Sequence, residues 1–293
     1  VTLSMLTDDA AVDERLLSGL RDVALNAELD PAFRALALTQ PARSDVMQRL
    51  HNAGATPDPF AIHAAQETIS HSLAEVLQND LGTIYVENQV RTPFAPTAEQ
   101  AGQRAMANMV LGLITRLDGG TEARKQFETA DNMTSTLGAL GALLSCEYGM
   151  NASQQFYETW KHERLVIDKW FSIQMTHAKP EEALDVVDRL SAHPDFSIKN
   201  PNRFRSVFGP FAGHAGFHAP DGGGYETLAD WLIKLDKINP QPTARSCSAF
   251  DSWRIFAPER QTQMQTAMQR ILDQEDLSRD TREMLTRILG EDG

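Results

Sequence analysis

Hydrophobic residues recur along this chain at the spacing of α-helices. The apolar residues between positions 11 and 24 follow an i, i+3, i+4, i+7 rhythm, which places them on one helical face. The same rhythm returns at residues 105–117 and at residues 264–272. The alternation of apolar and polar residues that is typical of strands is nearly absent. The pattern therefore predicts an all-α protein, with helices over these three ranges.

Helix-breaking residues divide the chain at intervals of roughly ten to twenty residues. Helices of that length joined by short polar turns predict antiparallel helix pairs stacked side by side. No strict repeat register is present, so we expect an irregular array. The breaks are Asp30-Pro31, Gln40-Pro41, Thr56-Pro57, Thr92-Pro93, Asp118-Gly119-Gly120, Lys179-Pro180, His193-Pro194, Asn239-Pro240 and Ala257-Pro258.

Two of the helix starts carry a specific signal. Asn200 precedes Pro201, and Asn239 precedes Pro240. Asn is a favoured N-cap residue, and Pro suits the first helical position because its missing N–H would have no partner there. We therefore expect helices to begin at both prolines.

Length and composition limit the class of protein. With 293 residues, of which 42% are apolar, the chain can bury a sizeable core as one large or two ordinary domains. The breaks near Pro93 to Pro96 and near Gly149 are too weak to define boundaries, so we expect a single domain over residues 1–293. The first residue is Val rather than Met, which suggests that the chain was excised from a larger protein.

Charge and cysteine content narrow the partners and the compartment. The formal net charge of −13 disfavours nucleic acid and anionic membrane, because both are polyanions. No run approaches the roughly 18 apolar residues of a membrane span, and the N-terminus lacks the features of a signal peptide. Two cysteines cannot build a disulfide framework, which favours a reducing compartment. We expect a cytoplasmic protein.

A histidine pair is the first candidate for chemistry. His214 and His218 have the i, i+4 spacing that would place two imidazoles on one helical face for zinc. Gly213, Gly216 and Pro220 oppose a helix there, and no Glu follows His214 as H-E-x-x-H would require. A loop or capping role is favoured over metal binding, and we expect no metal site.

Two other motifs also favour structural interpretations. Asp221-Gly-Gly-Gly-Tyr225 resembles a phosphate-binding loop, but it lacks a preceding strand and a Lys, so a turn into the next helix is favoured. Cys146 has no base marked by the sequence, and Cys247 lies in a turn of small residues. We expect both thiols to be buried and unreactive. No catalytic constellation remains, so we expect no catalytic residues and no cofactor in this chain.

Arg205 and Arg245 are the candidate binding residues. On a helical wheel Phe204, Val207, Phe208 and Phe211 form one apolar stripe, and Arg205 falls about 100° from Phe204 at its edge. That position suits a guanidinium whose stem packs on apolar surface while its donors reach a cavity. From the pattern alone, an ordinary surface or ion-paired arginine is the more favoured interpretation.

A set of short motifs occurs in a fixed order over most of the chain. The motifs are Asp30-Pro-Ala-Phe-Arg-Ala-Leu-Ala-Leu-Thr-Gln-Pro41, Arg104-Ala-Met-Ala-Asn108, Asn132-Met-Thr134, Asp168-Lys-Trp-Phe171, Asn200-Pro-Asn-Arg203 through Gly209, Phe217 through Tyr225, and Asp236 through Arg245. Together they resemble the C-terminal helical domain of the M1 zinc aminopeptidases, of the bacterial aminopeptidase N type.

The resemblance implies a fold and a function. It implies an α-superhelix like stacked HEAT or armadillo pairs, which closes over the active site of a larger enzyme. The family's catalytic domain carries H-E-x-x-H, the zinc and a Gly-x-Met-x-Asn segment, and none of these motifs is present here. The chain alone is then inactive, with zinc expected in the absent catalytic domain. The implied partners are the remaining domains of the same polypeptide and peptide substrates.

The resemblance changes which interpretation of Arg205 and Arg245 is favoured. Arg205 and Arg245 match arginines of the family that face the internal cavity, so a role in the substrate channel is now favoured for both. Cys247-Ser248-Ala249 departs from the bulkier apolar residues usual in the family, which puts the local helix packing in doubt.

An alternative from another class stays open, because fold alone does not determine function. A free-standing α-solenoid that binds a protein partner has the same helical pattern. The coding sequence upstream of Val1 discriminates between the two, since an in-frame H-E-x-x-H would favour the peptidase and an initiator Met would favour the scaffold.

Overall fold

The computed structural model describes residues 2–7 and 10–290. This part of the chain contains α-helices, four short 3-10 helices and no β-strand, which confirms the all-α prediction. The α-helices are α1 (Thr2–Thr7), α2 (Glu14–Leu25), α3 (Pro31–Leu38), α4 (Arg43–Asn52), α5 (Pro59–Leu77), α6 (Leu81–Glu87), α7 (Ala98–Asp118), α8 (Thr121–Thr129), α9 (Met133–Leu144), α10 (Gly149–Trp160), α11 (Arg164–Thr176), α12 (Ala183–Ser191), α13 (Pro201–Ala212), α14 (Gly223–Asp236), α15 (Pro240–Ser246), α16 (Pro258–Leu272) and α17 (Arg279–Leu289). The 3-10 helices are η1 (Pro180–Glu182), η2 (Ala215–His218), η3 (Cys247–Phe250) and η4 (Trp253–Ile255).

The helices form two compact units that interleave in sequence. Unit 1 comprises residues 1–42 and 61–159, and unit 2 comprises residues 43–60 and 160–293. Side-chain contacts explain why segment 43–60 belongs to unit 2. Arg43 donates to the carbonyl of Gly213 at 2.9 Å, and Arg260 forms an ion pair with Asp58 at 3.6 Å. The expectation of a single domain over residues 1–293 stays a prediction.

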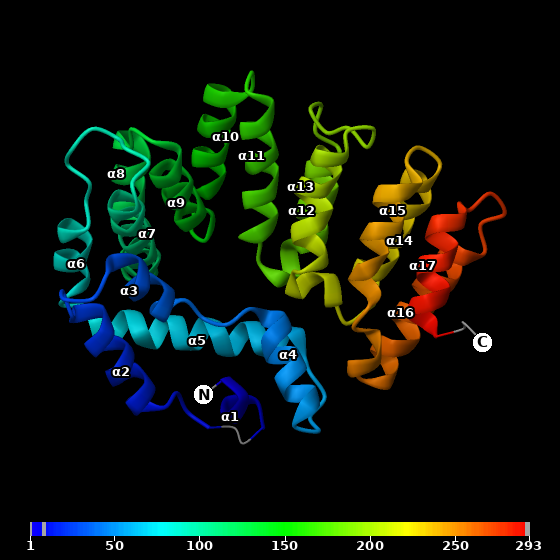
Figure 1. The fold of residues 1–293 in the computed structure, drawn as a ribbon, viewed down its shortest axis with the longest axis horizontal. Helices are drawn as coiled ribbons and strands as arrows, with labels where there is room; N and C mark the ends of the chain where they lie inside the picture. The colour runs from blue at the N-terminus through cyan, green and yellow to red at the C-terminus, as the bar shows by residue number, and fades with distance from the viewer. Residues whose placement is uncertain (1, 8–9, 291–293) are drawn as a thin grey trace. The chain divides into compact units, whose positions relative to one another are not determined.

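Helix α7 is the centre of unit 1. It packs against α3, α6, α8 and α9, so its buried residues lie on several sides of the helix (Figure 1). Small residues allow the closest approaches. A Cβ added to Gly138 of α9 would lie only 2.4 Å from the side chain of Asn108 on α7. The predicted helix over residues 105–117 is thus confirmed and forms the core of this unit.

Unit 2 is a stack of helices around an aromatic core. Helix α11 packs on α13, α14 packs on α15 and α16, and α15 packs on α17 (Figure 1). Neighbouring rings meet at centroid distances of 5.0–6.5 Å, mostly edge to face, which adds favourable geometry to the burial of area. The core rings are Phe171, Phe196, Phe208, Phe211, Phe217, Tyr225 and Phe250.

Hydrogen bonds to α17 hold the end of unit 2 in place. The buried carboxylate of Asp236 accepts from the backbone N–H of Ser278 at 2.8 Å, from its hydroxyl at 2.6 Å and from the hydroxyl of Thr281 at 2.5 Å. Trp253 Nε1 donates to the carbonyl of Ile288 at 3.0 Å. Both ends of α17 therefore satisfy buried polar groups of preceding elements.

The predicted helix starts are placed well, with two differences. The helix expected from residue 11 begins at Glu14, because the Asp13 carboxylate caps it by accepting from the N–H of Arg15. Asn200 is the predicted N-cap of α13 and accepts from two backbone N–H groups. Asn239 also occupies the N-cap position of α15, but its side chain accepts no capping hydrogen bond.

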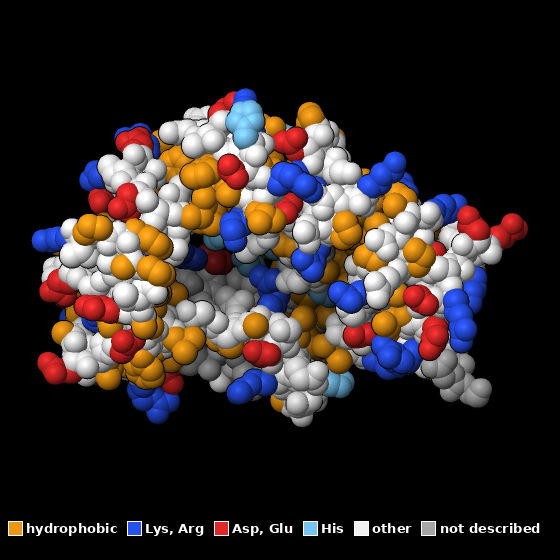
Figure 2. Space-filling view, turned by 45° about the horizontal axis from the view of Figure 1, so that its top comes forward, with side chains coloured by type: hydrophobic (Ala, Val, Ile, Leu, Met, Phe, Trp, Pro, Cys, Tyr) orange, Lys and Arg blue, Asp and Glu red, His pale blue; other side chains and the backbone are white. Residues whose placement is uncertain are grey.

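Neither the described helices nor the charges drawn in Figure 2 indicate a membrane-spanning segment or a face of one charge. No helix in residues 2–7 or 10–290 combines the length and apolar character that crossing a bilayer requires. On the face drawn in Figure 2, acidic and basic side chains are interspersed, with hydrophobic ones between them.

Candidate functional site

Helix α13 presents Arg205 to solvent. Phe204, Val207, Phe208 and Phe211 are each at most 2% exposed, so the predicted apolar stripe is buried. Arg205 lies outside this stripe and is exposed, as its position on the helical wheel indicates. Its Nη2 donates to Asn202 Oδ1 at 3.0 Å one turn earlier, and that neutral partner leaves the guanidinium charge available.

Helix α15 presents Arg245 in its last turn. The side chain is exposed, while the adjacent Thr243 and Ala244 are buried. The helix ends at Ser246 and tightens into the 3-10 helix η3, where the Ser248 hydroxyl donates to the Arg245 carbonyl at 2.9 Å. The small residues after Arg245, which put the local packing in doubt, are therefore accommodated by a change of helix type.

Both candidate arginines belong to unit 2. Helices α13 and α15 lie in neighbouring helix columns of that unit (Figure 1). Among the described residues neither guanidinium pairs with a carboxylate, and no hydrogen bond joins the two. Two exposed cations on one unit can hold peptide carbonyls or a carboxylate. Whether they face a substrate stays a prediction.

The histidine pair is used in structural hydrogen bonds. His214 is the N-cap of η2, where Nδ1 accepts from the N–H of Gly216 at 3.1 Å and Nε2 lies 3.0 Å from the carbonyl of Ala178. His218 Nδ1 lies 2.9 Å from the hydroxyl of Tyr225. Burial lowers the pKa of His218 to about 3, with nearby Arg260 adding to the effect. The capping role expected for His214 is confirmed.

The glycine-rich segment is a turn, as predicted. Asp221 Oδ1 accepts from the N–H of Gly223 at 3.0 Å, and α14 starts at that residue. Gly222 has a φ of 79°, which side chains rarely tolerate. A Cβ on Gly224 would lie 2.2 Å from the carbonyl oxygen of Phe217, so the glycines serve turn geometry and close packing.

The two thiols differ. Cys247 is buried, and burial raises its pKa to about 12, so the unreactive interpretation fits this residue. Cys146 is only half-buried, in a turn where its Sγ lies 3.2 Å from the carbonyl of Leu143. The expectation of a buried thiol is therefore confirmed for Cys247 and wrong for Cys146, because the turn after α9 leaves it partly open.

An ion pair that sequence reasoning missed joins two of the motifs. Arg203 Nε donates to Asp168 Oδ1 at 2.7 Å, with side-chain exposures of 6% and 18%. The same guanidinium lies 4.8 Å from the ring centroid of Phe171 and donates to the carbonyls of Asp195 and Arg164. Both residues lie in motifs noted in the sequence, Asp168-Lys-Trp-Phe171 and Asn200-Pro-Asn-Arg203. Nothing in the sequence indicates that the two motifs are in contact.

Other motif residues also hold the fold together. Arg34 of α3 is buried and donates to the carbonyl of Ala24 at 3.1 Å. Asn132 caps α9 by accepting from the N–H of Ser135 at 3.0 Å. These motif residues therefore form polar contacts between helices and within them.

The stacked helix pairs of the described residues define an all-helical domain. The chain belongs to the family described as "Domain of unknown function (DUF3458_C) ARM repeats", which matches residues 1–290.

Curated relatives connect this domain to aminopeptidases. The chain is 33% identical over 290 residues to aminopeptidase N of Caulobacter vibrioides, covering 96% of this chain and 33% of the relative. For aminopeptidase N of Haemophilus influenzae the identity is 33%, with 95% and 32% covered. For that of Escherichia coli it is 32%, with 92% and 31% covered. The chain therefore spans about a third of these relatives and is homologous to their C-terminal region.

A solved structure shares the fold. Legionella pneumophila aminopeptidase A, determined in complex with aspartic acid, superposes with a TM-score of 0.87 at 25% identity. The match covers 99% of this chain and 35% of the neighbour. The resemblance to the aminopeptidase family is thereby confirmed.

Proposed function

We propose that the chain is the C-terminal helical domain of a zinc aminopeptidase that removes N-terminal residues from peptides. In this proposal the domain covers the active site, lines the substrate channel and is inactive alone. The observation that carries it is the match to three aminopeptidases N over at least 92% of this chain but only about a third of theirs. The other domains of the same polypeptide are its partners, and the cytoplasmic location stays a prediction.

The zinc of the proposed enzyme does not fit the residues described here. No group of three His, Cys, Asp or Glu side chains in the described parts of the chain could hold a metal ion. Both ring nitrogens of His214 and Nδ1 of His218 already have hydrogen-bond partners. The metal therefore belongs to another part of the polypeptide in this proposal.

Catalytic inactivity of the isolated chain is the first expectation. Peptide hydrolysis at a metal centre needs a bound hydroxide and a polarised carbonyl. The described residues contain no group of three potential ligands to hold such a metal. The purified 293-residue chain should not hydrolyse aminoacyl anilides, whereas the polypeptide extended upstream should. Turnover by the chain with stoichiometric zinc would contradict the proposal. An extended polypeptide without activity would instead favour a free-standing protein-binding scaffold.

Arg205 and Arg245 have a positioning role in the extended enzyme. An exopeptidase holds the amino end of its substrate at the catalytic centre, so the rest of a peptide extends away from it. Fixed guanidinium groups can then bind peptide carbonyls or the C-terminal carboxylate. Each such contact contributes about 1.5–3 kcal/mol, which corresponds to about ten- to a hundredfold in affinity.

Substrate length provides the test. Replacing Arg205 or Arg245 by Ala should raise KM for tri- to pentapeptides by about tenfold or more. An aminoacyl anilide has no tail to hold, so its KM should hardly change. Lys should rescue only in part because it lacks the bidentate fork. Arg279→Ala, at an exposed position of α17, is the matched control. Equal losses for peptides and anilides, or no change, would contradict this role.

A further inference from the structure

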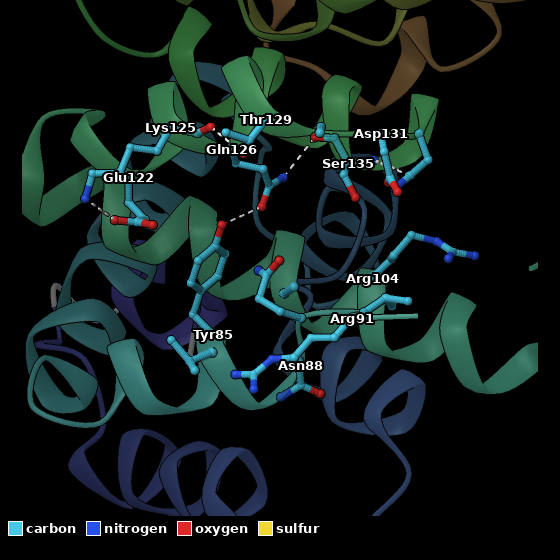
Figure 3. A pocket seen from close by; sticks show the side chains of 16 residues that line it. Tyr85, Asn88, Arg91, Arg104, Glu122, Lys125, Gln126, Thr129, Asp131 and Ser135 are labelled. Atoms are coloured by element: carbon cyan, nitrogen blue, oxygen red, sulfur yellow. Dashed lines mark hydrogen bonds and ion pairs between the residues drawn. The ribbon is translucent and has the colours of Figure 1, made fainter. Parts of the chain in front are cut away.

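Unit 1 contains a cavity of about 490 Å³ that no part of the proposed function uses. Helices α6, α7, α8 and α9 and the loops after α6 and after α8 supply its walls. Figure 3 shows Tyr85, Asn88, Arg91 and Arg104 along one side and residues of α8, α9 and the loop between them along the other. The volume lies in the range of sites that hold small organic molecules.

Arg104 is the unusual residue of this cavity. Its side chain is only 6% exposed, yet it forms no ion pair with any carboxylate of the described residues. Its two hydrogen bonds go to neutral acceptors, Gln100 Oε1 at 3.0 Å and the carbonyl of Ala95 at 3.5 Å. Its Nε is buried without any partner. A buried charge is costly unless a counter-ion faces it, so this guanidinium favours a negatively charged group beside it.

A second buried guanidinium reinforces the positive charge. Arg34 is also 6% exposed, and its Nε is also without a partner. Its Nη2 donates at 3.5 Å to Oδ1 of Asn88, a residue that lines the cavity. No ion pair between Arg34 and a carboxylate occurs within the described ranges. The two buried cations thus converge on one region of a chain whose formal charge is −13.

The surrounding contacts hold Arg104 in a fixed orientation. Gln100 Oε1 accepts from Arg104 and from the N–H of Ala95, while its Nε2 donates to Thr92 and to the carbonyl of Pro93. The ring of Phe94 lies over the guanidinium at 4.8 Å. This network satisfies two of the five N–H donors of the side chain. It supplies no negative charge, and it leaves Nε without an acceptor.

The opposite wall is also preorganised. Tyr85 donates its hydroxyl to Gln126 Oε1 at 2.8 Å, and Gln126 Nε2 donates to Asn108 and to the carbonyl of Ser135 at 2.9 Å each. Burial raises the pKa of Tyr85 to about 12, so its hydroxyl stays protonated and acts as a donor. Fixed polar groups of this kind orient a ligand rather than adapt to it.

The charges of the lining select among anions. Lys125 is already paired with Glu122 at 2.9 Å, and Asp131 also lines the cavity. With Lys125 and Glu122 paired, Arg91 and Arg104 face Asp131 as the remaining acidic group of the lining. The excess of one positive charge suits a single carboxylate, which also matches the planar donor fork of one arginine, better than a doubly charged phosphate. We propose that this cavity binds a small organic carboxylate through Arg104, with the exposed Arg91 as a second contact.

A matched pair of probes tests the proposal on the 293-residue chain. N-acetylglycine carries the carboxylate, and N-acetylglycinamide differs only in lacking it. Isothermal titration should show saturable binding of the acid, with the amide about tenfold weaker or more. Inorganic phosphate should bind more weakly than the acid. Equal binding of acid and amide, tighter binding of phosphate, or no saturable binding of the acid would overturn the proposal.

Variants locate the site. Arg104→Met should weaken binding of the acid by about tenfold or more without affecting the amide. Arg91→Gln should weaken it less and remains informative if Arg104→Met fails to fold. Arg124→Gln removes the same charge from α8 outside the cavity and should leave the affinity unchanged. Unchanged affinity in Arg91→Gln together with Arg104→Met, or equal loss in Arg124→Gln, would overturn the assignment.

The carboxylate can be a free molecule or a side chain of the same polypeptide. Repeating the titration with the extended enzyme proposed above separates the two sources. Retained binding of N-acetylglycine identifies a free ligand. Loss of that binding, with all cavity residues intact, shows that another part of the polypeptide occupies the cavity.

Discussion

Buried arginines in this chain differ in what balances their charge. Arg203 faces the Asp168 carboxylate, whereas Arg34 and Arg104 face only neutral oxygens. The charge of Arg203 is balanced within unit 2, so this ion pair contributes to the stability of that unit. The charges of Arg34 and Arg104 are not balanced by a carboxylate of the described residues of unit 1, and this is the basis for proposing an anionic ligand there.

Removing the partner of Arg203 should strongly destabilise unit 2. In Asp168→Ala the guanidinium remains buried without a counter-ion, so we expect a loss of about 3–5 kcal/mol in the free energy of unfolding. All four tryptophans, Trp160, Trp170, Trp231 and Trp253, lie in unit 2, so fluorescence during urea denaturation reports on that unit.

The control for this variant is Asp188→Ala, which removes an exposed carboxylate from α12 of the same unit. We expect a change within about 0.5 kcal/mol there. If Asp168→Ala lost no more than this control, the ion pair would be dispensable.

His218 should make the stability of unit 2 depend on pH. Its pKa is about 3 in the folded chain against an ordinary value of 6.5, because the imidazole is buried. Below pH 6.5 the unfolded state therefore binds a proton that the folded state excludes until about pH 3. The contribution of neutral His218 to the free energy of unfolding is therefore fully present above pH 6.5. Between pH 6.5 and about 3 this contribution falls by up to about 1.4 kcal/mol per pH unit.

The slope of the free energy of unfolding against pH tests the assignment to His218. His218→Gln should lower overall stability but flatten the dependence between pH 6.5 and 4.5, measured by urea denaturation and tryptophan fluorescence. The exposed His162 provides the control, and His162→Gln should keep the original slope. Identical slopes in all three proteins would contradict the assignment to His218.

Helix starts were predictable where the signal is local. Asn before Pro identifies the beginning of α13 and of α15, because capping and the fixed φ of Pro act within a few residues. Whether the Asn side chain forms the capping bond depends on its backbone and neighbours. It does so at Asn200 and not at Asn239.

The two Asn-Pro starts form a natural experiment on capping. Asn200→Ala should cost about 1 kcal/mol, because it removes the acceptor for the N–H groups of Asn202 and Arg203. Asn239→Ala removes no such bond and should cost at most a few tenths of that. Urea denaturation of unit 2 measures both, and equal losses would show that the capping geometry of Asn200 does not contribute.

Contacts between elements were the part that the sequence could not provide. The periodicity predicts that Phe204, Phe208 and Phe211 are buried, but it cannot say that Arg203 of α13 reaches Asp168 of α11. The two residues are 35 positions apart, and one sequence contains no covariation to connect them. For the same reason the sequence did not predict the cavity around Arg104, since its walls come from four helices and two loops.

The sequence predicted where the candidate arginines lie on their helices but not what their side chains contact in a larger enzyme. Helical phase places Arg205 at the edge of the apolar stripe, and the structure has it exposed there. What it faces in a larger enzyme depends on domains outside this chain, which no pattern within 293 residues contains.

At the scale of the molecule, folding should not depend on metal. Hydrogen bonds satisfy the buried His214, His218 and Asp236 without any ion. Adding EDTA should therefore leave the helical circular dichroism and the thermal midpoint unchanged. A midpoint that falls with EDTA and recovers with zinc would reveal a structural site that the described residues do not suggest.

Helix α17 sets a limit on how far the chain can be shortened. Without residues 278–289, Asp236 would keep a buried carboxylate with none of its three donors, and the indole N–H of Trp253 would lose the carbonyl of Ile288. The face of α15 that α17 covers would also be open to solvent. Such a product would be prone to proteolysis and aggregation during expression. The C-terminal boundary of any recombinant form should therefore lie beyond Leu289.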